Sequence, residues 1–156
     1  MATVTTREYN PTTGSLIGNI TSFSFGRVPV GTTSRVKVVD FAFTGVTSVS
    51  NVKLGLVSSG TTNVNPSPDD IQEDGSAGNG YFGIEHSTTF DSSKTSGSLS
   101  RHFAGLNTSG TSADPKNVTI GTRDDVLSQY VYLDIELSAN DTGEKSGVYK
   151  VFFDFE

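Results

Sequence analysis

Few side chains in this sequence could perform nucleophilic catalysis. Histidine occurs only as His86 and His102, whereas serine is found along the whole chain. A serine nucleophile needs a base beside it, and the base needs a further group that orients it. The chain also lacks a Gly-x-Ser-x-Gly segment, which would expose a serine on a sharp strand-to-helix turn. We interpret both histidines as loop residues and predict no catalytic residue and no enzymatic activity.

Acidic residues gather in one turn-rich stretch, residues 63–80, which is long enough to suggest a functional or disordered loop. Carboxylate oxygens are suitable ligands for calcium, but a calcium loop needs the spacing Asp-x-Asp-x-Asp-Gly. No acidic group in the chain has that spacing, so we predict a solvated loop without a metal or cofactor. Asp69 and Asp70 are kept as candidate interaction residues. The acidic groups considered are Asp69, Asp70, Glu73 and Asp74, together with residues 124–125 and 141–144.

Two further carboxylates, those of Asp134 and Glu136, are expected on one face of a strand. Their separation of about 6.5–7 Å along a strand falls in the range of inverting glycosidases. Tyr130 and Tyr132 share that face, which favours an ordinary polar outer surface. Together with Tyr81 they could also stack against a sugar, although the chain has no Trp and most of its 10 Phe are needed for a core. Two alternatives therefore remain open, a carbohydrate- or surface-binding module and a glycoside hydrolase-like enzyme.

Composition and charge exclude other classes of function. The 156-residue chain has a formal net charge of −6 and no basic cluster, so nucleic acid and acidic membranes are not expected partners. It has no cysteine, which excludes disulfides and thiolate metal sites. The N-terminal residues lack the apolar core of a secretory signal, and no window approaches the roughly 18–20 apolar residues of a membrane helix.

Alternation of apolar and polar residues predicts an all-β chain. No stretch longer than about ten residues has helical periodicity, and short apolar runs are separated by turn-forming residues. Many short strands of this kind are typical of a β-sandwich with long polar loops. The expected strands cover residues 20–25, 36–43, 52–56, 81–84, 118–120, 130–137 and 149–155.

The segment 36–43 is apolar on both parities, and its parity changes at Val38-Val39. One extra residue there would return the apolar side chains to one face, so we expect a β-bulge at this point. Without a bulge, the second half of the strand must be buried on both faces.

The last two expected strands, 130–137 and 149–155, alternate most regularly. A Gly-rich loop joins them, which predicts a β-hairpin. Their apolar parity gives the predicted core residues Val131, Leu133, Ile135, Tyr149, Val151 and Phe153.

Residues 25–34 read FGRVPVGTTS, with a proline and two glycines inside a short apolar segment. This sequence resembles the FGxVxVGxxS signature of the Hydin/ASH type of immunoglobulin-like domain, a relative of the PapD-like sandwiches. Residues 49–54 fit the family's V-x-x-V-x-L strand, whereas residues 40–45 read DFAFTG where the family has Leu-Thr-Asn-Thr-Gly. The resemblance covers residues 23–57. It implies an immunoglobulin-like antiparallel β-sandwich with Gly31 at positive φ, and it implies no activity.

The first 19 residues have few apolar groups and are interrupted by Pro11 and two glycines. We therefore predict two parts, an extended arm at 1–19 and a β-sandwich domain at 20–156. The arm is expected to lie on a neighbouring chain and to add backbone hydrogen bonds to an exposed sheet edge. Its anchors would be the apolar residues Val4, Tyr9, Leu16 and Ile17.

These features favour a non-catalytic assembly module. An immunoglobulin-like sandwich with an arm, without cysteine and without a signal peptide, is similar in style to small virion proteins of tailed phages. Such proteins decorate capsids or build tail and neck assemblies. We therefore expect a virion protein that is made in the host cytoplasm. Its partners would be further copies of itself or capsid and tail proteins.

Overall fold

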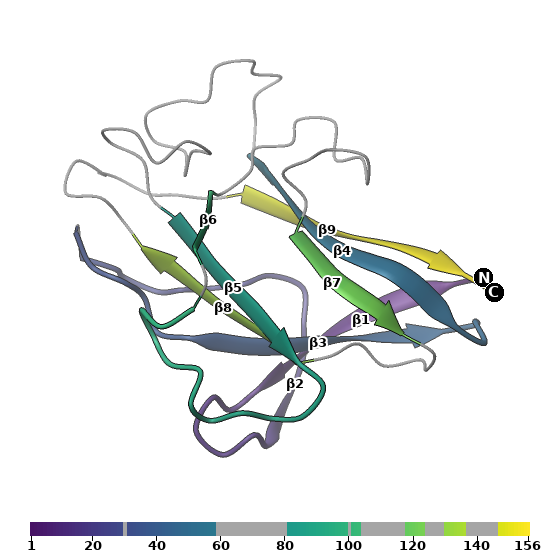
Figure 1. The fold of residues 1–156 in the computed structure, drawn as a ribbon, viewed down its shortest axis with the longest axis horizontal. Coiled ribbons are helices and arrows are strands. Elements are labelled where there is room, and N and C mark those ends of the chain that lie inside the picture. The colour runs from purple at the N-terminus through teal and green to yellow at the C-terminus, as the bar shows by residue number, and fades with distance from the viewer. Residues whose placement is uncertain (30, 59–80, 100, 104–117, 124–129, 137–146) are drawn as a thin grey trace.

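The computed structural model describes residues 1–29, 31–58, 81–99, 101–103, 118–123, 130–136 and 147–156. This part of the chain is all-β and contains no helix, as predicted (Figure 1). Its nine strands are β1 (Thr3–Tyr9), β2 (Leu16–Ile20), β3 (Lys37–Thr44), β4 (Val49–Ser58), β5 (Tyr81–Ser87), β6 (Arg101–Phe103), β7 (Val118–Arg123), β8 (Tyr130–Glu136) and β9 (Gly147–Phe155).

The described strands form two antiparallel sheets. The larger sheet has the order β2-β1-β3-β8-β5-β6, and the smaller one has the order β7-β4-β9. Strands distant in sequence are neighbours in both sheets, because β1 pairs with β3 and β4 pairs with β9. Both ends of the chain lie beside the turn after β3 (Figure 1): the Glu156 carbonyl accepts the Thr47 N–H at 2.6 Å.

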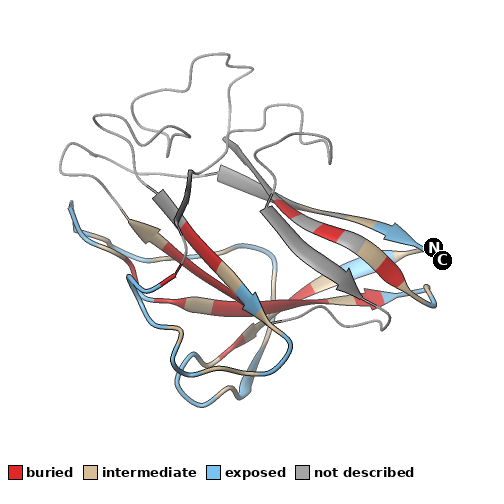
Figure 2. Cartoon of the chain, viewed as in Figure 1, coloured by how far each residue is buried: buried red, intermediate tan, exposed pale blue. Residues whose placement is uncertain are grey.

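Strand β3 lies inside the larger sheet and is buried on both faces, which Figure 2 shows as a red stretch along it. Its register with β1 runs without interruption from Thr3 opposite Thr44 to Tyr9 opposite Val38. The expected β-bulge at Val38-Val39 is therefore absent from this pairing. The apolar residues of both parities are buried instead, because each face of the sheet packs into a cluster of its own.

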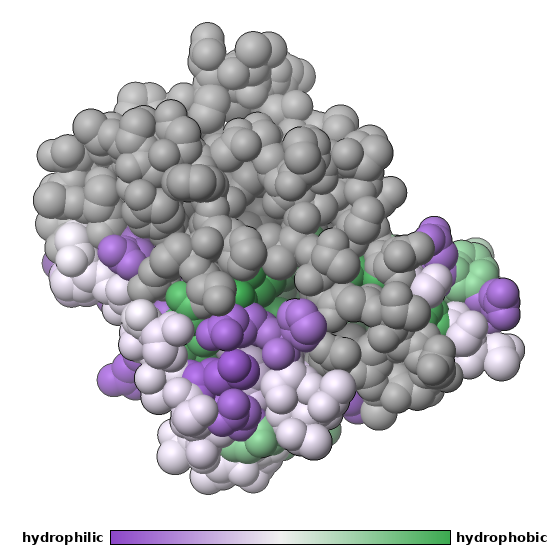
Figure 3. Space-filling view, in the orientation of Figure 1, coloured by the Kyte–Doolittle hydropathy of each residue, from purple (hydrophilic) through white to green (hydrophobic). Residues whose placement is uncertain are grey.

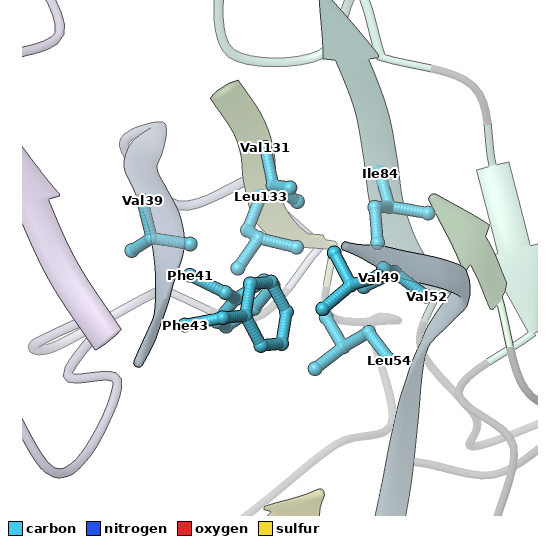
Figure 4. Packing of buried hydrophobic residues seen from close by; sticks show 9 residues of the cluster. All are labelled: Val39, Phe41, Phe43, Val49, Val52, Leu54, Ile84, Val131 and Leu133. Atoms are coloured by element: carbon cyan, nitrogen blue, oxygen red, sulfur yellow. The ribbon is translucent and has the colours of Figure 1, made fainter. Parts of the chain in front are cut away.

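The main core lies between the two sheets (Figure 4). The larger sheet supplies residues of β3, β5 and β8, and the smaller sheet supplies residues of β4. The core residues of β3 and β8 follow the period of two that places every second side chain on one face. In β4 the step from Val49 to Val52 breaks this period, at the point where its register with both neighbours shifts. The buried members are Val39, Phe41, Phe43, Val49, Val52, Leu54, Ile84, Val131 and Leu133.

Five of the six predicted core residues belong to this main core or pack against it. Val131 and Leu133 are fully buried, and three others pack against the cluster while partly buried. Those three are Ile135, Val151 and Phe153, whose ring meets Phe43 at a centroid distance of 4.7 Å. The sixth, Tyr149, has a side chain outside the described set. The apolar parity of β8 and β9 was thus predicted correctly.

A second cluster covers the opposite face of the larger sheet. It is formed by Tyr9, Val36, Val38, Leu99 and Tyr132, with Phe90 and Tyr130 packed against it. Residues 88–99 cover this face: the Asp91 N–H donates to the Tyr132 hydroxyl at 2.7 Å, and the Gly97 N–H donates to Asp134 Oδ2 at 2.9 Å. This face is therefore not the polar outer surface that the sequence predicted. Tyr132 and Asp134 are both fully buried.

The expected arm at residues 1–19 is part of the larger sheet instead. Strand β1 pairs along its whole length with β3, and β2 pairs with β1. The sequence Thr-Val-Thr-Thr-Arg-Glu-Tyr is rich in β-branched residues, which suit a strand although few of them are strongly apolar. The predicted boundary at residues 19/20 falls inside β2, so residues 1–19 do not separate from the domain.

The predicted hairpin of the last two strands is also absent. Strand β8 pairs with β3 and β5 in the larger sheet, whereas β9 pairs with β4 in the smaller one. Both strands present their apolar parity to the same core from opposite sides. Two strands that face each other across a core have the same alternation as two strands of a hairpin, so the pattern alone could not separate the two arrangements.

The stretch that resembles the family signature contains a turn, as predicted. Gly31 has φ 71°, and the Thr32 N–H donates to the Pro29 carbonyl at 3.1 Å. The strand expected at residues 20–25 is absent, however. β2 ends at Ile20, and residues 21–29 contain no strand. Phe23 and Phe25 still pack against the main core from this irregular segment.

Candidate interaction surface

The residues predicted to make contacts divide into buried and exposed groups. Tyr9 and Tyr132 belong to the second cluster, with 8% and 0% of their surface exposed. Tyr130 is half-buried, and its ring meets Tyr9 at 5.1 Å and Phe90 at 6.0 Å between centroids. The expected tyrosine platform for a sugar therefore loses Tyr132. Neither Tyr9 nor Tyr132 is free to anchor a neighbouring chain.

Several other candidates cannot be placed as side chains. Asp69 and Asp70 lie outside the described residues. Tyr81 lies on β5, opposite Glu136 of β8 in the register, but its side chain is outside the described set. Both histidines lie on strands, so their interpretation as loop residues was wrong. His86 is exposed on β5, and His102 is placed only as a backbone position on β6.

The pair of carboxylates expected to resemble a glycosidase has one member closed off from solvent. Asp134 is fully buried and accepts the Gly97 N–H from the covering segment 88–99. Glu136 is half-buried, and its backbone bridges to Thr33. A general acid or base must reach its substrate, so the geometry of Asp134 favours a structural role for this carboxylate.

A polar group that sequence reasoning missed lies beside the second cluster. Asp40 is buried and accepts two hydrogen bonds from Arg7, from Nε at 2.8 Å and from Nη2 at 2.5 Å. The Tyr9 hydroxyl donates to Asp40 Oδ2 at 2.8 Å. The hydrogen bond to Asp40 raises the pKa of Arg7. Burial, followed by the hydrogen bond to Asp40, raises the pKa of Tyr9 to about 12.

This group of three could be found only once the pairing was known. Arg7 lies directly opposite Asp40 in the register of β1 and β3, and opposite charges across a strand pair stabilise it. The same pair of strands holds a second ion pair, in which Lys37 Nζ donates to Glu8 Oε1 at 2.7 Å. Both charged side chains of β1 are thus turned toward β3. Their role is to bind the strand to its sheet.

The exposed candidates lie on or beside the edge of the larger sheet. β2 is an edge strand in the described sheet order, and its neighbour is β1. Leu16 and Ile17 are 54% and 61% exposed, and Val4 of β1 is also exposed. The register of the two strands shifts between Glu8 and Tyr9, which places a β-bulge near Ile17.

A short, well-defined turn holds β2 in place. The Asn10 carbonyl accepts the Gly14 N–H at 2.8 Å, and the Asn10 N–H donates to the Ser15 carbonyl at 2.8 Å. Gly14 has φ 75°, and an added Cβ would come within 2.7 Å of the Phe90 ring. The β1–β2 turn is therefore packed against the segment that covers the second cluster. The turn and its contact with Phe90 therefore hold the start of β2 beside β1.

Apolar surface is otherwise scarce in the described part of the chain. The described atoms in Figure 3 are mostly white and purple, with green areas in the middle of the face next to the grey atoms, at the lower edge and beside the chain ends. The exposed large apolar residues are Met1, Val4, Leu16, Ile17 and Phe155. Two of these five, Leu16 and Ile17, are neighbours on β2, and two others, Met1 and Phe155, lie at the adjoining chain ends.

Metal binding finds no support in the described ranges, where no group of three acidic or histidine side chains could hold an ion. Those ranges also contain no helix long and apolar enough to span a membrane. Comparison of the chain with protein-family models, curated proteins and solved structures gave no match.

Proposed function

We propose that this chain is a non-catalytic structural protein of a virion, of the capsid-decoration or tail and neck type, and that its β2 edge binds neighbouring proteins. We also propose that its two sheets form an immunoglobulin-like sandwich. The resemblance of residues 25–34 and the shared core between the sheets support that proposal. The proposal replaces the expected arm by a rigid edge strand.

One observation carries this function: the edge strand β2 exposes Leu16 and Ile17. An edge strand offers a row of backbone groups to which an incoming strand can bind. Backbone hydrogen bonds then supply affinity, and pockets for alternate side chains supply specificity. Natural edges are protected by charge, proline, short length or a β-bulge. β2 contains no charge and no proline, and its protection is limited to its length of five residues and the bulge near Ile17. An apolar, uncharged edge is suited to a permanent contact.

The remaining functions have weaker support. A sugar-binding surface would have to use Tyr130 without Tyr132, and a hydrolase would have to use a carboxylate that the segment 88–99 covers. Neither function uses the exposed apolar edge. Assembly through β2 uses it directly.

Incorporation into particles tests the proposal. Epitope-tagged wild-type chain, expressed during infection by a phage that encodes it, should co-sediment with purified virions. The Ile17→Lys variant should fold normally and be lost from the particles, because the lysine disrupts the edge contact. The Thr47→Lys variant is the matched control: Thr47 is exposed beside the chain ends, and this variant should be incorporated. Absence of the wild-type chain from particles would contradict the virion proposal.

A further inference from the structure

The segment 88–99 connects β5 to β6 and covers the second cluster, but most of its own side chains face solvent. Among its residues Leu99 alone is buried, while Phe90, Asp91 and Lys94 are half-buried, and Figure 2 shows this connection mainly in pale blue. The segment contains no strand or helix, so it adds no backbone ladder to the sheet. A segment with few buried apolar side chains and no ladder belongs to the least stable parts of a fold.

Two turns give the segment a structure of its own. In the first turn, Asp91 Oδ1 accepts the Ser93 N–H at 2.9 Å and the Ser93 hydroxyl at 2.6 Å. In the second turn, the Ser98 N–H donates to the Thr95 carbonyl at 3.0 Å, and the Thr95 N–H donates to the Ser98 hydroxyl at 3.0 Å. These bonds join residues within the segment, so they can persist when the segment leaves the sheet.

Hydrogen bonds and the two ends of the segment attach it to the sheet. Its backbone N–H groups donate to the Tyr132 hydroxyl and to Asp134, and the Ser96 hydroxyl donates to the Ser34 carbonyl at 2.6 Å. Such hydrogen bonds contribute little net free energy, because water takes the place of the lost partner when they open. Apolar contacts with the second cluster come from the side chains at the two ends.

The sheet beneath the segment is held together without it. β5 pairs with β8 from Tyr81 to Ser87, and β6 pairs with β5, with Arg101 opposite Gly83. The residues of the main core, buried or partly buried, all lie outside the segment. The segment can therefore leave the second cluster while its ends stay attached to the sheet and the main core stays packed.

We infer that the segment 88–99 opens as one unit from the second cluster while both sheets remain folded. This inference does not depend on the β2 contact or on a virion. Opening uncovers the Tyr132 hydroxyl and the Asp134 carboxylate, which lose their donors from the segment, together with the apolar side chains of Val36 and Val38. The fold thus contains a surface that solvent reaches only after the segment has moved.

Thiol labelling of two matched variants is the first test, because the chain contains no cysteine of its own. Val38 and Val39 are neighbours on β3 and both are fully buried, but Val38 belongs to the second cluster and Val39 to the main core. Without urea, Val38→Cys should react with a thiol reagent at least about tenfold faster than Val39→Cys, because local opening needs less free energy than global unfolding. Low urea should barely change the Val38→Cys rate and should steeply raise the Val39→Cys rate, since the urea dependence scales with the surface exposed.

Each labelling rate is compared with the urea unfolding of the same variant, so that a general loss of stability is not mistaken for local opening. Circular dichroism should show the same β content in both variants and in wild type. If Val38→Cys reacts only through global unfolding, with the urea dependence of Val39→Cys, the inference is overturned.

Amide hydrogen exchange of the wild-type chain is the second test and needs no substitution. The amides of Asp91 and Gly97, which donate to side chains of β8, should exchange by a process that low urea does not accelerate. The amides of β3 should exchange only through global unfolding. Equal rates and equal urea dependence at the two sites would overturn the inference. So would rapid exchange at Asp91 and Gly97 without labelling of Val38→Cys, because the bonds would then break without uncovering the cluster.

Discussion

Tyr9 couples the stability of the folded chain to pH through its contact with Asp40 and Arg7. Arg7 and Tyr9 both donate to the Asp40 carboxylate, so the neutral phenol of Tyr9 has a partner in the folded chain. Ionisation of Tyr9 would place a second negative charge beside that carboxylate in a buried position. The folded state therefore holds the Tyr9 proton more tightly than the unfolded state does.

The pH dependence follows from this difference. The pKa of Tyr9 is about 12 in the folded chain, against an ordinary value of 10.0. The stabilising contribution of Tyr9 is complete below pH 10 and is lost as the pH rises toward 12, because the unfolded state then releases the proton first. Urea unfolding of wild type and Tyr9→Phe should show a constant difference in unfolding free energy below pH 10. That difference should shrink above it, and a difference independent of pH up to 12 would contradict the assignment.

Gly31 is a second residue whose identity is set by local geometry. Its φ of 71° lies in the left-handed region, where a Cβ is strained. Gly31→Val should reduce the free energy of unfolding by roughly 1–3 kcal/mol. Gly31→Asn should cost less, because asparagine tolerates this region better than other side chains do. Equal losses for the two variants in urea unfolding would show that the positive φ is not the reason for the glycine.

At the scale of elements, the first two strands changed most between expectation and structure. β1 has only Val4 and Tyr9 as large apolar residues, so the alternation of apolar and polar residues does not predict a strand there. Its stability comes from pairing with β3 and from cross-strand ion pairs, which the sequence shows only after the register is known. The β-branched threonines were the available signal.

Removal of these strands should therefore unfold the domain. A variant lacking residues 2–18 loses β1 and most of β2, and it leaves β3 as an exposed apolar edge. We expect loss of cooperative thermal unfolding and aggregation, measured by circular dichroism and light scattering. The double variant Leu16→Ser/Ile17→Ser alters only exposed side chains and should retain the wild-type melting temperature. A truncated protein that unfolds cooperatively would restore the idea of a separate arm.

The apolar parity of β8 could be predicted from the sequence, but the burial of its polar parity could not. Tyr132 and Asp134 look like surface residues when the strand is considered alone. Their burial depends on the segment 88–99, whose apolar anchors are only Phe90 and Leu99 and whose contacts are mostly hydrogen bonds. Contacts of this kind depend on tertiary position, so no local pattern encodes them.

At the scale of the whole molecule, the all-β class and the positions of most strands could be read from alternation, whereas the order of the strands could not. Alternation says which side chains share a face, but the neighbour of a strand depends on long-range pairing. Leu16 and Ile17 were predicted from the sequence as contact residues of an arm, and their contact role stays a prediction. The structure shows both residues exposed on the outermost strand of the larger described sheet.

The central claim, that the chain binds its neighbours through the outer edge of β2, can be tested residue by residue with amide hydrogen exchange. Exchange should be measured for the dissociated chain and for the chain in its assembled form. If neighbours bind at β2, amides of residues 16–20 should exchange more slowly after assembly, while those of β7 and β9 keep their rates, because new backbone hydrogen bonds form only at β2. Slower exchange at β7 or β9, with the β2 amides unchanged, would contradict binding at β2.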